Sequence, residues 1–270
     1  MHPSLPVVLT IAGSDSGAGA GIQADLKTFA AMGVYGTSAI TAITAQNTVG
    51  VSAAQVLPSD LVVAQIEAVA SDFTIAATKT GMLGSAAVVE AVAAAIADLE
   101  LPLVVVDPVM QAKGGDRLLD TDAVAALRQT LLPHALVVTP NIPEAEALTG
   151  ITIRNLDDAK RAAERLRGHR GPAVVVKGGH AEGPEVVDLL FDGERFYEFR
   201  VPRIDSRNTH GTGCTFASAI AASLAHGRSL PDSTARAQAY VSDAIRCGLA
   251  LGSGHGPLDH FWAMRRPHTG

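Results

Sequence analysis

A glycine-rich segment in the last third of the chain carries the residues best suited to chemistry. Residues 208–215 read Asn-Thr-His-Gly-Thr-Gly-Cys-Thr, and a helix-favouring run, residues 216–222, follows directly. A glycine turn that leads into a helix directs unpaired backbone N–H groups and the positive end of the helix dipole at one point, which suits an anion. Cys214 lies in that field, where a thiolate is favoured. The segment therefore predicts an anion hole beside a candidate base or nucleophile.

Cys214 has two other interpretations. Free cysteines are often small buried apolar residues, although the preceding Gly-Thr-Gly argues against that role here. A cysteine hydrolase would pair the thiol with a base such as His180 or His210, but the chain carries no local signature of that class.

The apolar pattern predicts strands and helices that alternate along the chain. We expect strands at residues 7–11, 36–45, 77–81, 103–107, 136–139, 173–177, 186–191 and 196–201. We expect helices over residues 22–29, 58–70, 86–99, 121–131, 143–148, 156–166, 213–225 and 231–249. The alternation predicts one α/β domain over residues 1–270, with helices on both faces of a mostly parallel sheet. Functional groups in such folds gather at the carboxyl ends of the strands.

Several of these strand ends carry polar residues. The loop at residues 13–21 holds four glycines, and a Gly-Ala-Gly-Ile-Gln-Ala run that begins in it fits a weak dinucleotide fingerprint. That fingerprint needs an acidic residue about 20 positions on, and none occurs between Leu26 and Ser59. Gln46 follows the second strand, and its amide could recognise a heteroaromatic ring, although, taken alone, it is better explained as part of an ordinary polar loop.

The later strand ends combine carboxylates with a lysine. Asp107 ends one strand, Asn141 and Glu144 follow another, and Lys177 ends a third. Carboxylates in such places suit Mg²⁺, which takes few protein ligands besides phosphates and waters. Asn141 is at least as well explained as a helix cap, since Pro143 and Glu144 follow it.

Composition narrows the class of protein. The net charge is −6, from 21 basic and 27 acidic residues, and no basic block occurs, which argues against nucleic acid or an anionic membrane as partner. Two cysteines, Cys214 and Cys247, make no disulfide framework. No run reaches membrane-spanning length, about 20 residues, and no signal sequence is evident. We therefore expect a soluble cytoplasmic protein.

Taken together, these segments resemble the bacterial hydroxymethylpyrimidine/phosphomethylpyrimidine kinases of thiamine biosynthesis, in the ribokinase-like superfamily. The resemblance runs nearly end to end, and its specific stretches are residues 19–29 (Gly-Ala-Gly-Ile-Gln-Ala-Asp-Leu-Lys-Thr-Phe), 45–48 (Ala-Gln-Asn-Thr), 79–83 (Lys-Thr-Gly-Met-Leu), 139–145 (Thr-Pro-Asn-Ile-Pro-Glu-Ala), 177–180 (Lys-Gly-Gly-His) and 208–215. It departs at residues 14–18, Ser-Asp-Ser-Gly-Ala, where relatives often carry Asp-Pro-Ser-Gly-Gly.

The resemblance implies a three-layer α/β/α ribokinase-like fold, use of ATP and Mg²⁺, and a homodimer. It also implies a role for individual residues. Catalysis falls to Cys214 with the amides of Gly211, Thr212 and Gly213. The pyrimidine would contact Gln46, Gly13, Asp25, Met82 and Val109. The nucleotide phosphates would lie at Lys177, Thr209 and Asn141, with Mg²⁺ at Glu144 and Asp107.

The implied reactions are two phosphoryl transfers from ATP, first to the hydroxymethyl oxygen and then to the monophosphate. An alcohol must lose a proton whereas a phosphate monoester is already anionic, so we expect Cys214 to matter for the first step and little for the second. We further expect Lys113 or Arg117 to close on the monophosphate. The alternatives are a pyridoxal kinase of the same superfamily and a catalytically silent sensor of a vitamin precursor.

Overall fold

A single sheet organises the described residues, which are 5–110, 121–180 and 183–265 of the computed structural model. Its strand order is β3-β2-β1-β4-β5-β6-β7-β8-β9. The pairs among β1, β2, β4, β5, β6 and β7 are parallel, while β2–β3, β7–β8 and β8–β9 are antiparallel. The strands are β1 Val7–Asp15, β2 Tyr35–Gln46, β3 Val51–Val56, β4 Ile75–Thr80, β5 Val104–Val106, β6 Val137–Val138, β7 Ala173–Val176, β8 Glu185–Phe191 and β9 Phe196–Pro202. The mostly parallel sheet expected from the sequence is confirmed.

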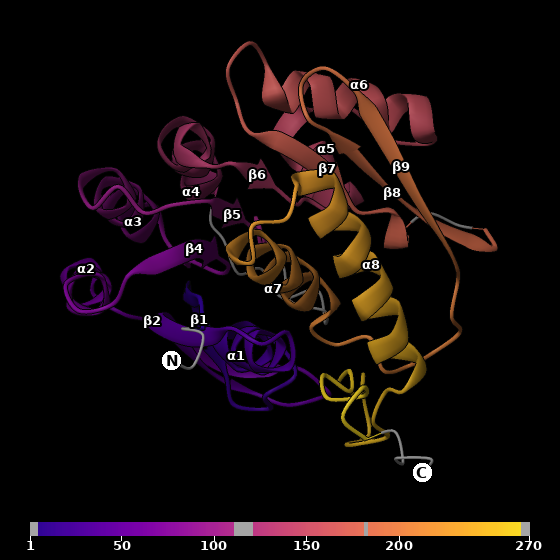
Figure 1. Ribbon diagram of the computed structural model, residues 1–270, viewed down its shortest axis with the longest axis horizontal. Coiled ribbons are helices and arrows are strands. Elements are labelled where there is room, and N and C mark those ends of the chain that lie inside the picture. The colour runs from indigo at the N-terminus through magenta and orange to yellow at the C-terminus, as the bar shows by residue number, and fades with distance from the viewer. Residues whose placement is uncertain (1–4, 111–120, 181–182, 266–270) are drawn as a thin grey trace.

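Helices cover both faces of this sheet, which gives the three layers seen in Figure 1. One layer contains α2 Ser59–Ala70, α3 Ala86–Asp98, α4 Thr121–Ala126, α5 Ile142–Thr149 and α6 Leu156–Arg167. The other contains α1 Gly21–Ala31, α7 Thr212–Ala225 and α8 Leu230–Arg246. In the part of the chain that the structure describes, no helix is both long and apolar enough to cross a membrane.

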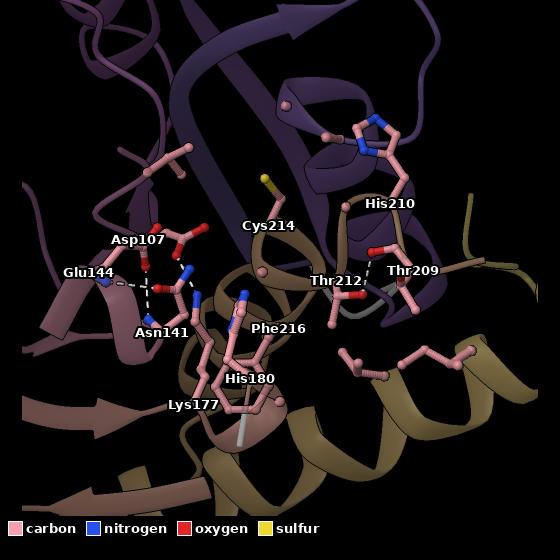
Figure 2. A pocket seen from close by; sticks show the side chains of 18 of the residues that line it. Asp107, Asn141, Glu144, Lys177, His180, Thr209, His210, Thr212, Cys214 and Phe216 are labelled. Atoms are coloured by element: carbon pink, nitrogen blue, oxygen red, sulfur yellow. Dashed lines mark hydrogen bonds and ion pairs between the residues drawn. The ribbon is translucent and has the colours of Figure 1, made fainter. Parts of the chain in front are cut away.

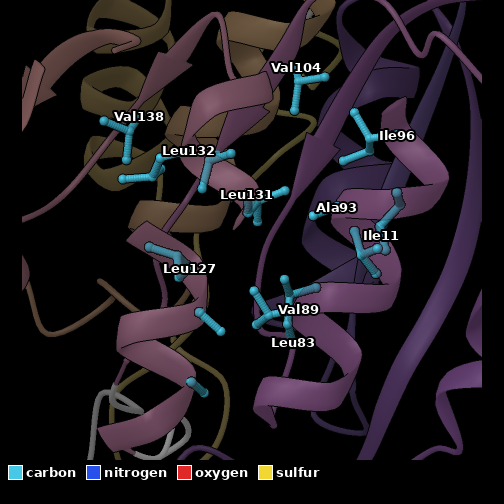
Figure 3. Packing of buried hydrophobic residues seen from close by; sticks show 14 of the residues in the cluster. Ile11, Leu83, Val89, Ala93, Ile96, Val104, Leu127, Leu131, Leu132 and Val138 are labelled. Carbon is cyan, nitrogen blue, oxygen red and sulfur yellow. The ribbon is translucent and has the colours of Figure 1, made fainter. Parts of the chain in front are cut away.

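The two layers divide the core because successive side chains of a strand point to opposite faces. Val104 and Val106 pack with the α2–α6 layer (Figure 3), whereas Val105 packs with α1, α7 and α8. The same alternation separates Val138 from Val137. The Val-rich runs are therefore buried on both faces, as parallel strands require.

Three local predictions need correction. Strand β3 was not predicted, because its sequence, Val-Ser-Ala-Ala-Gln-Val, holds few strand-favouring residues and its middle side chains are exposed at the sheet edge. Strand β1 runs on to Asp15, across an irregularity between Ala12 and Ser14. The predicted helix over 121–131 changes after α4 into a π-helical turn, Leu127–Leu131, and a 3₁₀ turn, Leu132–His134.

The strand order creates a crevice beside β1. The chain passes from β1 to β2 on one side, and later adds β4 to β7 on the other side. Ligands of open α/β sheets bind at the carboxyl ends of the strands where the order reverses in this way. The end of β1 and the ends of its neighbours β4 and β5 are therefore the expected floor of a site.

Helix α2 offers a direct test of the core. Ile66 is fully buried, whereas Leu61 on the same helix is 49% exposed. Ile66→Ala should lower the free energy of unfolding by about 2–5 kcal/mol, because it removes buried methyl groups and leaves a cavity. Leu61→Ala should change it by about 0.5 kcal/mol or less. Chemical denaturation measures both, and equal effects would contradict this packing.

Candidate functional site

One cavity of about 660 Å³ lies at the carboxyl ends of the strands. It is lined from β1, β2, the segments after β4, β5, β6 and β7, and the N-terminus of α7. Every residue that the sequence analysis assigned to the site lines this cavity except Asp25. Figure 2 shows Asp107, Asn141, Glu144 and Lys177 on one side of Cys214, and Thr209, Thr212 and His210 on the other. Segments from both ends of the chain, from Ala12 to Ile245, thus converge on one place.

The turn before α7 has the geometry of an anion hole. Gly211 precedes the helix with φ +84°, a conformation that glycine adopts without strain, and no side chain caps the helix end. The first amides of a helix have no partner within it. The Thr212 amide donates to the Thr209 carbonyl at 3.4 Å, whereas the amides of Gly213 and Cys214 make no such bond in the described part of the chain and are available to a ligand at the cavity. Thr212 supports the turn, since its hydroxyl donates to the Thr209 carbonyl at 2.7 Å. This arrangement agrees with the predicted anion-binding turn.

The first glycine loop packs directly on that turn. A Cβ on Gly211 would lie 1.8 Å from the Gly19 carbonyl oxygen, and one on Gly19 would lie 2.3 Å from Cδ2 of His210. Asp15 anchors the loop by accepting hydrogen bonds from the amides of Gly17, Gly19 and Ala20 at 2.8–3.1 Å. Asp15 Oδ2 also lies 2.8 Å from His210 Nε2. Glycine is needed here because the two backbones touch.

Cys214 does not carry the thiolate that the helix terminus alone suggested. Burial raises the pKa of its thiol to about 12, and Asp25 and Asp107 raise it further, against the opposing effects of Lys79 and a hydrogen bond from the Gly21 amide. The free energy that the thiolate loses on leaving water is larger than the free energy that it gains from the helix end and from one lysine. Burial therefore favours the neutral thiol of Cys214, whereas the helix end alone would favour the thiolate.

The phosphate-facing side of the cavity combines a lysine with two carboxylates. Lys177 Nζ lies 2.8 Å from Asp107 Oδ1, and both side chains are largely buried. Burial lowers the pKa of Lys177, but Asp107 and Glu144 raise it more, so the lysine stays charged. Burial raises the pKa of Glu144 to about 7, with a further rise from Asp107. A cationic ligand would relieve the repulsion between these carboxylates.

Asn141 and Glu144 form a helix cap, which was one of the two interpretations of the sequence for Asn141. The Glu144 amide donates to Asn141 Oδ1 at 2.9 Å, and the Asn141 amide donates to Glu144 Oε2 at 2.8 Å. This is a capping box at the start of α5. Both residues still line the cavity. The cap holds the carboxylate at the cavity wall.

The donor set here fits Mg²⁺ only with help from other ligands. Among residues 5–110, 121–180 and 183–265, no group of three or more His, Cys, Asp or Glu side chains could hold a metal ion. Glu144 and Asp107 offer two carboxylates at one end of the cavity. Mg²⁺ typically takes one or two protein carboxylates, with substrate phosphates and waters completing its shell, so these residues fit a phosphate-bound ion.

At the opposite end of the cavity, the residues that the resemblance assigns to the pyrimidine ring surround a partly apolar space. Gly13, Gln46, Met82 and Val109 all line it. A Cβ on Gly13 would lie 3.1 Å from the Met82 sulfur, so this glycine keeps room beside the methionine. Gln46 is partly exposed, with its amide oxygen 3.1 Å from the Thr44 hydroxyl. The amide is thus held at the cavity edge, ready to meet a ring with polar atoms.

Asp25 lies one layer behind the cavity wall. It is fully buried, and Lys79 Nζ donates to its Oδ2 at 2.8 Å. The sequence analysis placed Asp25 beside the ring, whereas the structure places its carboxylate in an internal ion pair. Lys79 itself lines the cavity and was not assigned to the site. The sequence did contain a signal for Lys79, because a lysine is unexpected within a strand that is otherwise buried.

Asp188 is a second residue that sequence reasoning missed. It lines the cavity and is 5% exposed, and its carboxylate accepts from the Gly178 amide at 2.8 Å and from Gln238 Nε2 at 2.9 Å. It thereby holds the backbone next to Lys177, and only the folding of β8 beside β7 brings it there. Lys113 and Arg117, expected to close on a monophosphate, lie outside the described residues.

Comparison with known proteins identifies relatives of this arrangement. The sequence pattern of the phosphomethylpyrimidine kinase family matches residues 15–259. The hydroxymethylpyrimidine/phosphomethylpyrimidine kinase of Bacillus subtilis is 50% identical over 259 residues, which cover 96% of each chain. The thiamine biosynthesis bifunctional protein ThiED of Geobacter sulfurreducens is 53% identical over 95% of this chain, and the match spans only 52% of that longer protein.

A solved structure shows the same fold. The ADP complex of Bacillus subtilis pyridoxal kinase superposes with a TM-score of 0.90 at 36% identity, over 97% of this chain and 100% of that one. The three-layer fold that the sequence resemblance implied is thus confirmed.

The contact between Gly211 and Gly19 can be tested against a matched glycine. Gly211→Ala should destabilise the fold by several kcal/mol, because its Cβ would overlap the Gly19 carbonyl and because φ +84° strains any residue with a Cβ. Gly227 has a similar φ of +77° with open space around it, so Gly227→Ala reports the strain alone. Thermal unfolding compares them, and equal losses would show that the contact contributes nothing.

Proposed function

The chain belongs to the phosphomethylpyrimidine kinase family, and we propose that it transfers phosphate from ATP to hydroxymethylpyrimidine and then to the resulting monophosphate, in thiamine biosynthesis. The observation that carries this proposal is the convergence of an anion hole, Lys177 and two carboxylates on one cavity. Phosphoryl transfer asks chiefly for alignment and charge stabilisation, which this set supplies. The ADP bound to the related pyridoxal kinase supports ATP as the donor.

The cavity has two chemically different ends for the two substrates. Asp107, Glu144 and Lys177 would face the phosphates of ATP, and Asp107 and Glu144 would hold Mg²⁺, which would supply positive charge to neutralise those phosphates. Val201, Ile204, Val241 and Ile245 provide apolar surface for the adenine. Gln46, Met82 and Val109 surround the acceptor ring at the opposite end. Cys214 and the amides of α7 lie between them.

The transfer then follows from this order. The acceptor oxygen forms a bond to the γ-phosphorus while the bond to the ADP oxygen breaks. The amides of Gly213 and Cys214 donate to the phosphoryl oxygens, where negative charge is concentrated, and Lys177 compensates the charge on the ATP side. In the first reaction the hydroxyl proton passes to Cys214 in the small fraction of enzyme that carries the thiolate, which thereby becomes a thiol. In the second reaction the attacking phosphate oxygen carries no proton to remove.

A pyridoxal-type ring is the second candidate acceptor, since the pyridoxal kinase of Bacillus subtilis shares the fold over nearly the whole chain. We further propose a single catalytic domain over residues 1–270, a cytoplasmic location and a homodimer as the working form. Closure of Lys113 or Arg117 over the monophosphate also stays a prediction.

A substrate panel tests the proposed function. A coupled assay of ADP release should show turnover with hydroxymethylpyrimidine and with its monophosphate, and slower turnover with pyridoxal. Turnover with pyridoxal alone would support the second candidate. Failure of all three acceptors to release ADP would overturn the kinase proposal for this chain.

The role of Cys214 is tested by assaying the two phosphorylations separately. Cys214→Ala should slow the first about 100-fold or more, as expected for loss of a general base, and the second about threefold or less. Because the thiol pKa is raised to about 12, the thiolate fraction grows with pH. The first-step rate should therefore rise from pH 7 to pH 9 in the unmodified enzyme, and this rise should disappear in Cys214→Ala.

Cys247→Ala is the matched control, because Cys247 is exposed and does not line the cavity. It should leave both steps unchanged. Equal losses in the two steps for Cys214→Ala would show that the thiol serves the site only through packing.

A further inference from the structure

A fully buried ion pair lies directly behind the cavity, and the proposed chemistry does not use it. The side chains of Lys79 and Asp25 are both 0% exposed, with Nζ and Oδ2 2.8 Å apart. Taking two charges out of water is costly, so a buried pair is weak evidence of a role in stability. An enzyme that keeps such a pair next to its reacting groups invites a functional explanation.

The Asp25 carboxylate ties together three elements that form the site. It accepts from Thr10 on β1 at 2.7 Å, from Lys79 on β4 at 2.8 Å and from Ser218 on α7 at 2.6 Å. Lys79 has no other hydrogen-bond partner among the described residues. Its Nζ lies against Gly81, where a Cβ would be only 2.7 Å away. Two of its N–H donors are thus left without a hydrogen bond beside the cavity wall.

The thiol of Cys214 interacts electrostatically with both members of this pair. Cys214 and Ser218 are four residues apart on α7 and so share one face of the helix, with Cβ atoms about 5–6 Å apart. Because Ser218 reaches the Asp25 carboxylate, the thiol lies one helical turn along the same face. Four charges act on it: Lys79 on β4 and Lys177 after β7 favour the thiolate, whereas Asp25 on α1 and Asp107 after β5 oppose it.

We propose that Lys79 and Asp25 are positioning residues for the reaction, which act through Cys214 by setting how readily its thiol gives up a proton. Lys79 favours the thiolate, and Asp25 both holds the lysine in place and opposes the thiolate. The proposed role of both residues is electrostatic, and neither is assigned a proton transfer. The inference deepens the proposed function, since it rests on the thiolate as acceptor of the hydroxyl proton.

In the first phosphorylation, the thiolate removes the proton of the attacking hydroxyl as the oxygen bonds to the γ-phosphorus and ADP leaves. The thiol then returns its proton to solvent. The ion pair alters only the fraction of enzyme that carries the thiolate. The second phosphorylation needs no such proton transfer and should be insensitive to this pair apart from packing.

Alkylation of the thiol tests the proposal without depending on catalysis. The rate of iodoacetamide modification of Cys214 would be followed from pH 7 to pH 10, with mass spectrometry resolving each cysteine. Lys79→Gln should slow modification about tenfold or more, and Asp25→Asn should speed it by a similar factor, since a unit charge a few ångströms away shifts a pKa by a unit or more. Exposed Cys247 is the internal control and should react unchanged in every variant.

A second pair of variants avoids leaving a lone buried charge. Thr10→Val keeps the shape of the side chain but removes one donor that partly compensates the negative charge of Asp25, so Cys214 should react about threefold more slowly. Thr78→Val is the matched control, because the buried Thr78 hydroxyl has no hydrogen-bond partner. It should leave the Cys214 rate unchanged.

Opposite changes in the rate of Cys214 alkylation for Lys79→Gln and Asp25→Asn would establish the proposal, because damage to packing would change both rates in the same direction. Shifts of the same sign, or no shift at all, would overturn it. If the single-charge variants fail to fold, a slower Cys214 in Thr10→Val but not in Thr78→Val supports the proposal, and equal rates overturn it. Should the thiol respond as expected while Cys214→Ala leaves the first phosphorylation intact, the electrostatic inference stands and the proposed role of the thiol fails.

Discussion

The close contact between the start of α7 and the ends of the central strands is the constraint on which the site depends. Gly211 and Gly19 approach until no Cβ fits between them, and Gly213 lies against the Lys177 and Asp107 side chains. This contact aims the helix amides at the cavity and brings the thiol of Cys214 within the field of several charges. A bulkier residue would separate the helix from the sheet, and the anion hole would lose its opposite wall. The glycines are therefore required by packing as much as by flexibility.

Burial then determines how the charged groups behave. The site keeps its charges in opposite pairs, Lys177 with Asp107 at the cavity and Lys79 with Asp25 behind it. Pairing preserves each charge against the cost of desolvation. Groups that lack a full partner shift toward neutrality, as the raised pKa values of Cys214 and Glu144 show. The cavity is thus prepared for ligands that bring both negative phosphates and a cation.

The anchoring of the first glycine loop illustrates how secondary structure serves the site. Asp15 is the last residue of β1 and fastens three backbone amides of the loop, while His210 approaches it from the segment before α7. Asp188 does the same for the backbone beside Lys177. Neither carboxylate has a place in a sequence motif that predicts its task. Asp15 therefore fixes the first glycine loop, and Asp188 fixes the backbone beside Lys177. Phosphates must fit between these two segments.

Sequence patterns alone could predict the α/β alternation, because strands buried on both faces must be rich in Val and Ile. They also predicted the residues of the site, since glycine turns and charged residues at strand ends are recognisable where they occur. They missed β3 because an exposed edge strand needs no apolar signature. The resemblance to a known family placed Asp25 beside the ring, but only the fold shows that its buried carboxylate meets Lys79.

What the sequence by itself determined was the chemistry available: an anion-binding turn, a thiol, a lysine and carboxylates, in the order typical of its family. What only the tertiary structure decided was how those groups behave together. The protonation of Cys214 is the clearest case, since the local helix end favours a thiolate and the surrounding protein reverses that preference. The reason is physical: desolvation and long-range pairing depend on neighbours from distant parts of the chain, and only the fold brings them close.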